Sequence, residues 1–230
     1  MWFKIYISET YLIIFLLFII EKVKKTEEYT IEYNYTVKEL YRIKKSNIFW
    51  KIVDKLACKI NKIAKLYEKT VGKEYRRERE RFSLSKAKKI LHIGSGSYPI
   101  SAIVLAEMDD VNITTIDDNA KAVKLANKVI KRKNLNGKIR VEQGDGTKYP
   151  LDGFDTFIIS GCSFPKVKIL KHIIKDAKPQ SKIIVRDSFL DIESIINSLN
   201  PPQDITIVEK MENHPFPTSR WESILITKNN

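Results

Sequence analysis

The stretch Lys89-Ile90-Leu91-His92-Ile93-Gly94-Ser95-Gly96-Ser97-Tyr98-Pro99-Ile100 decides the fold of this chain. Its first part, residues 90–93, is a short apolar run that predicts a buried strand. The run leads into Gly94-x-Gly96, and apolar residues then recur at helical spacing. Gly94 permits a turn that a side chain would block, and Gly96 lets a ligand approach the backbone closely. A strand, a glycine turn and a helix start predict the first βα unit of a nucleotide-binding type of α/β fold.

Further strands and helices follow this unit in alternation. The strands are predicted at 111–116, 138–143, 154–160, 182–186, 205–210 and 221–228, and the helices at 120–133, 165–174 and 191–199. The last two strands have no helix between them. The fold class we predict is therefore α/β: a doubly wound, mostly parallel seven-stranded sheet with an antiparallel edge strand, preceded by an N-terminal helical region.

Three segments are predicted along the chain: a hydrophobic N-terminal segment at 1–25, a basic helical region at 26–85 and the α/β domain at 86–230. A capping box at 36–39 would open a helix. A long apolar pattern at helical spacing runs from 47 to 81, and we expect Gly72 to interrupt it. We interpret the mixed charges of 73–81 as a solvated helix and 83–85 as the linker into the α/β domain.

The first twenty residues contain ten consecutive apolar residues, Tyr11 to Ile20, followed by several lysines. Ten residues are too few to span a bilayer, and no small-residue cleavage site follows. The run would be a helix buried against the domain or a dimer mate, an anchor on a membrane surface, or, counted back to Trp2, a marginal membrane-spanning helix. Burial or self-association is our first interpretation, and membrane attachment through residues 1–20 is the second. We therefore expect a cytoplasmic protein, with membrane association as the alternative.

The net charge of +13 is concentrated in the N-terminal part. Residues 1–89 hold 22 Lys and Arg against 11 Asp and Glu, whereas residues 90–230 hold 19 against 17. This asymmetry suggests an anionic partner or a lysine-rich solvated face, and we favour the latter. The two cysteines and three histidines show neither a disulfide framework nor metal-ligand spacing, so we expect no metal site and a reducing environment.

Acidic residues follow two of the predicted strands. Asp117 and Asp118 end the second strand, and Asp145 follows the third between two glycines. A carboxylate at the end of the second strand of such a fold accepts hydrogen bonds from ribose hydroxyls. Pro99 stands where dinucleotide sites have a third glycine, which argues against NAD as the ligand.

The pattern resembles the class I S-adenosylmethionine-dependent methyltransferase family over residues 87–228. The resemblance rests on the glycine loop, on Ile116-Asp117, on Gly144-Asp145, on Gly153-Phe154-Asp155 and on the closing strand at 221–228. It implies S-adenosylmethionine as cofactor, bound by Gly94, Ser95, Gly96, Asp117, Asp118, Asp145, Gly146, Ser160 and Gly161. The family commonly has an acidic residue two positions before the first glycine, and His92 stands there instead.

Within that superfamily, the glycine loop with Tyr98-Pro99, the segment Phe164-Pro165-Lys166 and the segment Val185-Arg186-Asp187 are similar to the nicotianamine-synthase-like branch. That branch transfers an aminocarboxypropyl group and uses a carboxylate from the helical N-terminal region. The resemblance makes Glu78 a candidate for that carboxylate. Tyr98, at the edge of the glycine loop, is a candidate for orienting an acceptor or for a packing role.

We therefore expect an enzyme that is an S-adenosylmethionine-dependent methyltransferase acting on a small-molecule or lipid-like acceptor. Nicotianamine-synthase-like aminocarboxypropyl transfer is the first alternative. An RNA methyltransferase and a non-catalytic membrane-associated scaffold are the others. The motif of base-methylating enzymes is absent after the fourth strand, and no nucleic-acid-binding module is found, so we do not favour a nucleic-acid partner. Methyl transfer needs mainly alignment and a dry pocket, so no catalytic residue is assigned.

Overall fold

The computed structural model describes residues 37–199, 205–215 and 220–229. The expected capping box, which needs Thr36, and the apolar run Tyr11 to Ile20 lie outside these residues. Among the described helices, none is long and apolar enough to cross a membrane. The segment 83–85, which we interpreted as a linker, contributes to the short 3-10 helix η1 (Leu84–Lys86), and Leu84 is buried there.

The helices and strands follow the predicted alternation closely. In chain order they are α2 (Val37–Lys59), α3 (Asn61–Arg81), η1, β1 (Lys89–Ile93), α4 (Ile100–Leu105), β2 (Asn112–Asp117), α5 (Ala120–Arg132), β3 (Ile139–Gln143), β4 (Thr156–Ile159), α6 (Lys166–Asp176), β5 (Lys182–Asp187), α7 (Ile192–Leu199), β6 (Ile205–Asn213) and β7 (Trp221–Lys228).

The seven strands form one sheet in the order β3-β2-β1-β4-β5-β7-β6. The first five strands pair in parallel. β7 is antiparallel to both β5 and β6, so it lies one position in from the edge and β6 is the edge strand. The predicted fold class, a doubly wound sheet with antiparallel pairing at one edge, is confirmed.

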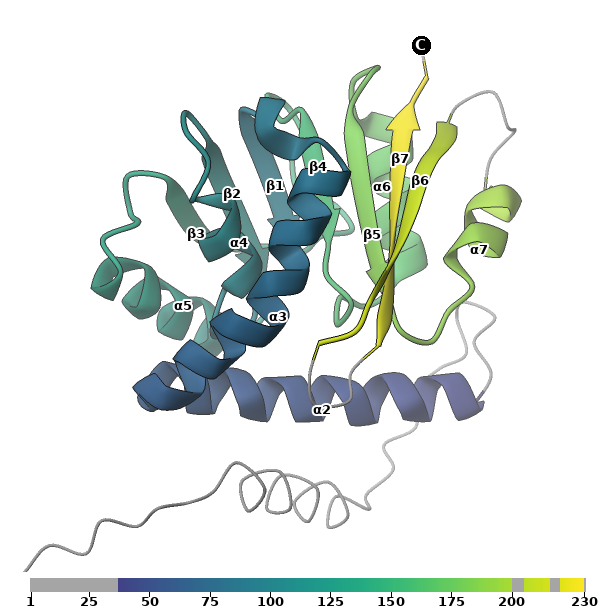
Figure 1. The fold of residues 1–230 in the computed structure, drawn as a ribbon. Helices are drawn as coiled ribbons and strands as arrows, with labels where there is room; N and C mark the ends of the chain where they lie inside the picture. The colour runs from purple at the N-terminus through teal and green to yellow at the C-terminus, as the bar shows by residue number, and fades with distance from the viewer. Residues whose placement is uncertain (1–36, 200–204, 216–219, 230) are drawn as a thin grey trace, which may run out of the picture.

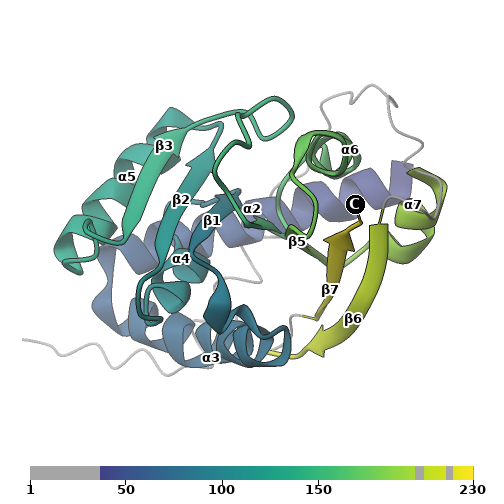
Figure 2. The same ribbon diagram turned by 90° about the horizontal axis from the view of Figure 1, so that it is seen from above.

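Alternate residues of the strands face two separate apolar cores, as the two-residue period of a strand requires. Ile90 of β1 and Ile184 of β5 face the core that contains α3, α4 and α5. Leu91 of β1 and Ile183 of β5 face the core that contains α6 and α7. Helices therefore cover both faces of the sheet (Figure 2), and the strands are buried on both sides.

The two N-terminal helices pack against the α/β domain, and α2 runs below the carboxyl ends of the parallel strands (Figure 1). The expected interruption at Gly72 is wrong. The chain breaks instead at Ile60, which is extended with φ −116° and ψ 107°. Gly72 lies inside α3, and a Cβ built on it would lie 3.5 Å from Ile100 and Val104 of α4. Its small size allows the two helices to approach closely without a break.

Candidate functional site

A cavity of about 520 Å³ opens at the carboxyl ends of the parallel strands, and residues of α2 and α3 also line it. This is where ligands bind in open α/β sheets. The residues that the resemblance implied for the cofactor all line it: Gly94, Ser95, Gly96, Asp117, Asp118, Asp145, Gly146, Ser160 and Gly161. The topology thus brings together four strand ends that are up to 67 residues apart in the sequence, counting from Gly94 to Gly161.

The glycine loop after β1 has the backbone that only glycine adopts freely. Gly94 has φ +88° and Gly96 has φ +62°. The amides of Gly94 and Ser95 donate to the carbonyl oxygen of Ile116 at 2.8 and 2.9 Å, which fixes the loop against β2. A Cβ on Gly94 would collide with the hydroxyl of Ser163. The loop is therefore rigid and tightly enclosed on one side.

Asp117 at the end of β2 is held by two backbone amides. Its Oδ2 accepts from the Gly96 amide at 2.9 Å and its Oδ1 from the Asn119 amide at 3.0 Å. Burial raises its pKa, while these amide bonds oppose the shift. Each carboxylate oxygen keeps a further lone pair, so the group can still accept from a diol.

The acidic and small residues of the neighbouring strand ends complete the floor. Asp145 accepts from the amide and the hydroxyl of Thr147 at 2.9 and 2.8 Å, and these bonds lower the pKa of Asp145. Gly146 is buried, and a Cβ there would lie 2.6 Å from Ile93. Asp118 is exposed at the rim. The carbonyl oxygen of Gly161 accepts from the ammonium of Lys166 at 3.0 Å.

His92, which replaces the acidic residue common in the wider family, is a neutral buried side chain. Its Nδ1 lies 2.7 Å from the Thr115 hydroxyl and its Nε2 lies 2.8 Å from the Ser160 hydroxyl. Burial lowers the pKa of His92 to about 3, and Arg186 adds to this effect. His92 therefore joins β1, β2 and β4 by neutral hydrogen bonds and carries no charge at neutral pH.

Asp54 on α2 is a functional candidate that sequence reasoning missed. It is 8% exposed and lines the cavity. Its Oδ2 accepts from the Ser97 amide at 2.9 Å and touches the position that a Cβ on Gly96 would occupy. Burial raises the pKa of Asp54 to about 7, although hydrogen bonds from the loop backbone and from Tyr67 oppose the shift. An acid on the apolar side of α2, between Val53 and Ala57, is the signal that could have identified it.

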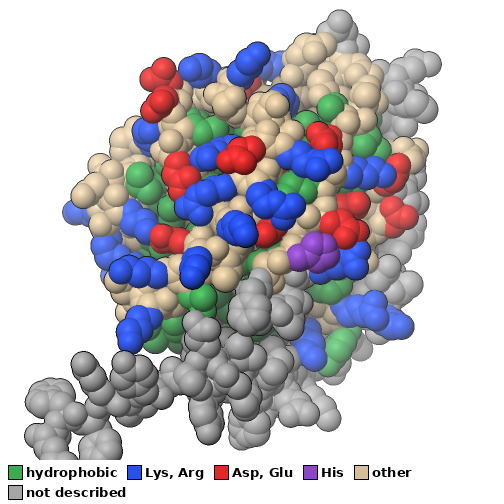
Figure 3. Space-filling model, viewed as in Figure 1, with side chains coloured by type: hydrophobic (Ala, Val, Ile, Leu, Met, Phe, Trp, Pro, Cys, Tyr) green, Lys and Arg blue, Asp and Glu red, His purple; other side chains and the backbone are tan. Residues whose placement is uncertain are grey.

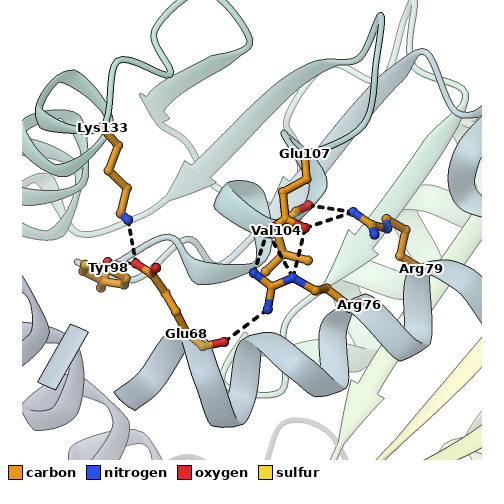
Figure 4. Close-up of polar contacts among 7 residues, drawn as sticks. All are labelled: Glu68, Arg76, Arg79, Tyr98, Val104, Glu107 and Lys133. Atoms are coloured by element: carbon orange, nitrogen blue, oxygen red, sulfur yellow. Dashed lines mark hydrogen bonds and ion pairs between the residues drawn. The ribbon is translucent and has the colours of Figure 1, made fainter. Parts of the chain in front are cut away.

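Tyr98 also lines the cavity, but its hydroxyl is held by a helix of the N-terminal region. Its ring is 1% exposed, and its hydroxyl donates to the carboxylate of Glu68 on α3 (Figure 4). Lys133 forms an ion pair with the same carboxylate at 2.6 Å. Farther along α3, Arg76 binds both carboxylate oxygens of Glu107, which follows α4. This network fastens the glycine loop and α4 to α3.

Glu78 does not line the cavity, but it contacts a residue that does. Both of its oxygens accept from Arg186 on β5, at distances from 2.5 to 3.2 Å, and the hydroxyl of Ser223 on β7 donates to Oε2 at 2.5 Å. Arg186 lines the cavity, lies 4.0 Å above the Tyr75 ring and donates to Ser101 at 2.6 Å. The expectation that 73–81 is a solvated helix is therefore wrong, because Glu74 and Glu78 are buried.

A second buried ion pair supports the loop after β4. Lys166 at the start of α6 lies 2.6 Å from Asp187 at the end of β5, and both side chains are 3% exposed. The Lys166 ammonium also donates to the carbonyl oxygens of Gly161 and Arg186. It therefore holds together the ends of β4 and β5, where Gly161 and Arg186 line the cavity.

Comparisons with known proteins agree with this fold. Residues 60–229 match the family model "Nicotianamine synthase protein". No curated protein sequence matches this one. A mutant of MtNAS in complex with S-adenosylmethionine is similar in structure at 16% identity and a TM-score of 0.61, covering 84% of this chain and 76% of that one. MtNAS in complex with MTA and tNA is 14% identical with a TM-score of 0.58, covering 85% of this chain and 78% of that one.

Methyltransferases share the fold as well. The mitomycin 7-O-methyltransferase MmcR is 16% identical with a TM-score of 0.54, covering 83% of this chain and 67% of that one. At these identities the structural likeness shows the fold alone, whereas the family model spans most of the chain. The family match favours nicotianamine-synthase-like transfer, the first alternative that the sequence suggests, over the methyl transfer that we expected first. The chain belongs to the nicotianamine synthase family of S-adenosylmethionine-dependent transferases.

Proposed function

We propose that this enzyme transfers the aminocarboxypropyl group of S-adenosylmethionine to the amino group of a small acceptor. The family match supports this reaction rather than methyl transfer. Within the structure, one observation carries the proposal: α2 places the carboxylate of Asp54 in the cavity, beside the glycine loop. Methyl transfer to an acceptor that is already nucleophilic needs no such group. Transfer to an ammonium group needs a base that removes its proton.

The residues of the cavity fit S-adenosylmethionine. A Cβ at Gly94 would collide with the Ser163 hydroxyl and one at Gly96 with the Asp54 carboxylate, so glycine at both positions lets the loop line the cavity this close to those groups. Asp117 offers free lone pairs for the ribose hydroxyls, and Asp145 lies at the next strand end for the adenine. The cavity volume of about 520 Å³ lies within the usual range for a ligand pocket.

Asp54 suits the role of base because its pKa is raised to about 7. A carboxylate with an ordinary pKa near 4 accepts a proton from an ammonium group weakly, whereas a base poised near neutral pH accepts it more readily. Burial supplies the shift, and the Ser97 amide keeps the carboxylate in place. α2 therefore contributes the proton acceptor, and the strand ends contribute the binding site.

Bound S-adenosylmethionine supplies a carbon activated by the positive sulfur. The acceptor nitrogen forms a bond to the γ-carbon of the methionine part, the bond between that carbon and sulfur breaks, and its electron pair goes to sulfur. The products are the alkylated amine and methylthioadenosine. Asp54 takes the proton that the acceptor nitrogen loses. Arg186, already neutralised by Glu78, forms part of the cavity wall.

The test is product analysis. The purified full chain is incubated with S-adenosylmethionine alone and with a panel of α-amino acids, and the nucleoside products are separated by chromatography. We expect methylthioadenosine to form. Formation of S-adenosylhomocysteine instead would establish methyl transfer and overturn the proposal.

The role of Asp54 is tested with Asp54→Asn, which keeps the shape and removes the base. We expect turnover to fall by about 10²–10⁴-fold while S-adenosylmethionine still binds. The matched control is Asp109→Asn, an exposed residue that does not line the cavity. Equal activity of Asp54→Asn and the wild type would exclude Asp54 as the base.

A further inference from the structure

The charged side chains that the structure describes as exposed on α2 all carry one sign of charge. Among its described side chains seven are exposed, and six of these are basic: Lys38, Arg42, Lys45, Lys51, Lys55 and Lys59. We call these six residues the basic face of α2. The seventh is Tyr41, which is 54% exposed. Within the described residues, none of the six charged groups has an ion-pair partner.

The neighbouring surface is different. On the side of the molecule formed by α3 and the last strands, acidic and basic side chains are interspersed (Figure 3). Arg76 pairs with Glu107 there, and Arg81 pairs with Glu209 at 2.7 Å. A solvated face normally shows such mixed signs. The uniform positive charge of the basic face of α2 therefore needs another explanation.

The sequence before α2 adds an apolar element to this charge. Tyr11 to Ile20 are ten consecutive apolar residues, and the positions between them and α2 include Lys22, Lys24 and Lys25. One apolar anchor with an adjacent polybasic patch is the combination that holds proteins stably on anionic bilayers. A nucleic acid could bind the basic residues, but it would not account for the apolar run. An exposed tyrosine such as Tyr41 is typical of the bilayer interface.

We propose that the basic face of α2 docks the protein on an anionic lipid surface. Lys51 and Lys55 belong to the basic face and also line the cavity. Docking through α2 therefore places the cavity at the membrane surface. This inference concerns location and holds for any reaction in the cavity.

The experiment is co-sedimentation of the full chain with two kinds of vesicle, phosphatidylcholine alone and phosphatidylcholine mixed with phosphatidylserine. The test variant combines Lys38→Glu, Arg42→Glu and Lys45→Glu, three residues that do not line the cavity. The matched control combines Lys171→Glu, Lys175→Glu and Lys178→Glu, which are exposed on and after α6. Both variants carry the same change in net charge, and an unchanged thermal unfolding transition shows that both fold.

We expect the wild type to bind the anionic vesicles much more tightly than the neutral ones and to release them as salt is added. The α2 variant should lose roughly 100-fold in partitioning, at about fivefold for each basic residue removed, whereas the α6 variant should keep wild-type binding. Equal binding to both vesicle types, or an equal loss in both variants, would overturn the proposal. Tight binding of RNA without vesicle binding would assign the basic face of α2 to nucleic acid instead.

Discussion

Arg186 on β5 and Glu78 on α3 form a bidentate ion pair in the interior, with side chains that are 2% and 1% exposed. The pair joins a residue of the cavity wall to a helix of the N-terminal region across 108 positions of sequence. Because both groups are removed from water, each depends on the other for compensation of its charge.

Glu78→Gln should therefore destabilise the protein strongly. It leaves the Arg186 guanidinium buried without a counter-charge, which costs about 3–5 kcal/mol. Chemical denaturation of the wild type and the variant measures this difference. The control is Glu80→Gln, two positions along α3 and exposed, which should change stability by less than about 0.5 kcal/mol. Similar stabilities for both variants would show that the buried pair contributes nothing specific.

Gly96→Ala should impair both stability and binding of S-adenosylmethionine. The added Cβ would meet the Asp54 carboxylate, and the φ of +62° is strained for alanine. We expect a loss of about 1–3 kcal/mol in stability and weaker binding by calorimetry. Gly137→Ala is the matched control, because a Cβ there has no heavy atom within 4 Å. Wild-type binding by Gly96→Ala would mean that the loop does not contact the ligand.

Asp117→Ala should abolish tight binding of S-adenosylmethionine. It removes the acceptor expected for the ribose hydroxyls and the bond that the Gly96 amide makes. Loss of a charge-assisted pair of hydrogen bonds weakens binding by about 10²-fold or more. Isothermal titration calorimetry measures the change. Asp118→Ala, at the exposed rim, should have a smaller effect, and the reverse order would assign the ribose to Asp118.

The raised pKa of Asp54 makes stability depend on pH. The folded state holds this proton up to about pH 7, whereas the unfolded chain releases it near the ordinary value of 3.8. Folding is therefore favoured by the bound proton at low pH, and this contribution declines as pH rises from about 4 to about 7. Compared with Asp54→Asn, the wild type should lose stability across this interval and then level off. Parallel urea titrations at several pH values test the sign, and a constant difference would place the pKa of Asp54 near its ordinary value.

The sequence alone predicts which residues lie at the strand ends. It does not predict how the helices that cover these ends pack against them. Gly94, Asp117 and Asp145 follow apolar strands directly, and parallel topology brings such positions to one edge of the sheet. The position of Asp54 depends on how α2 packs across the glycine loop, a tertiary contact that no local pattern encodes. The break at Ile60 has no glycine or proline to mark it. In the sequence, Glu78 stands in a run of charged residues that looks solvated. Its burial becomes evident only from its contact with Arg186 in the structure.

The hydrogen bond from Ser223 to Glu78 links the last strand to a helix made near the start of the chain. β7 also separates β5 from β6, so β6 has no partner in the sheet until β7 is present. During synthesis, the wall around Arg186 is therefore incomplete until β7 has left the ribosome. A nascent chain arrested before Trp221 would expose an unpaired strand edge and lack a finished site, so β7 is the strand that completes both the sheet and the cavity wall.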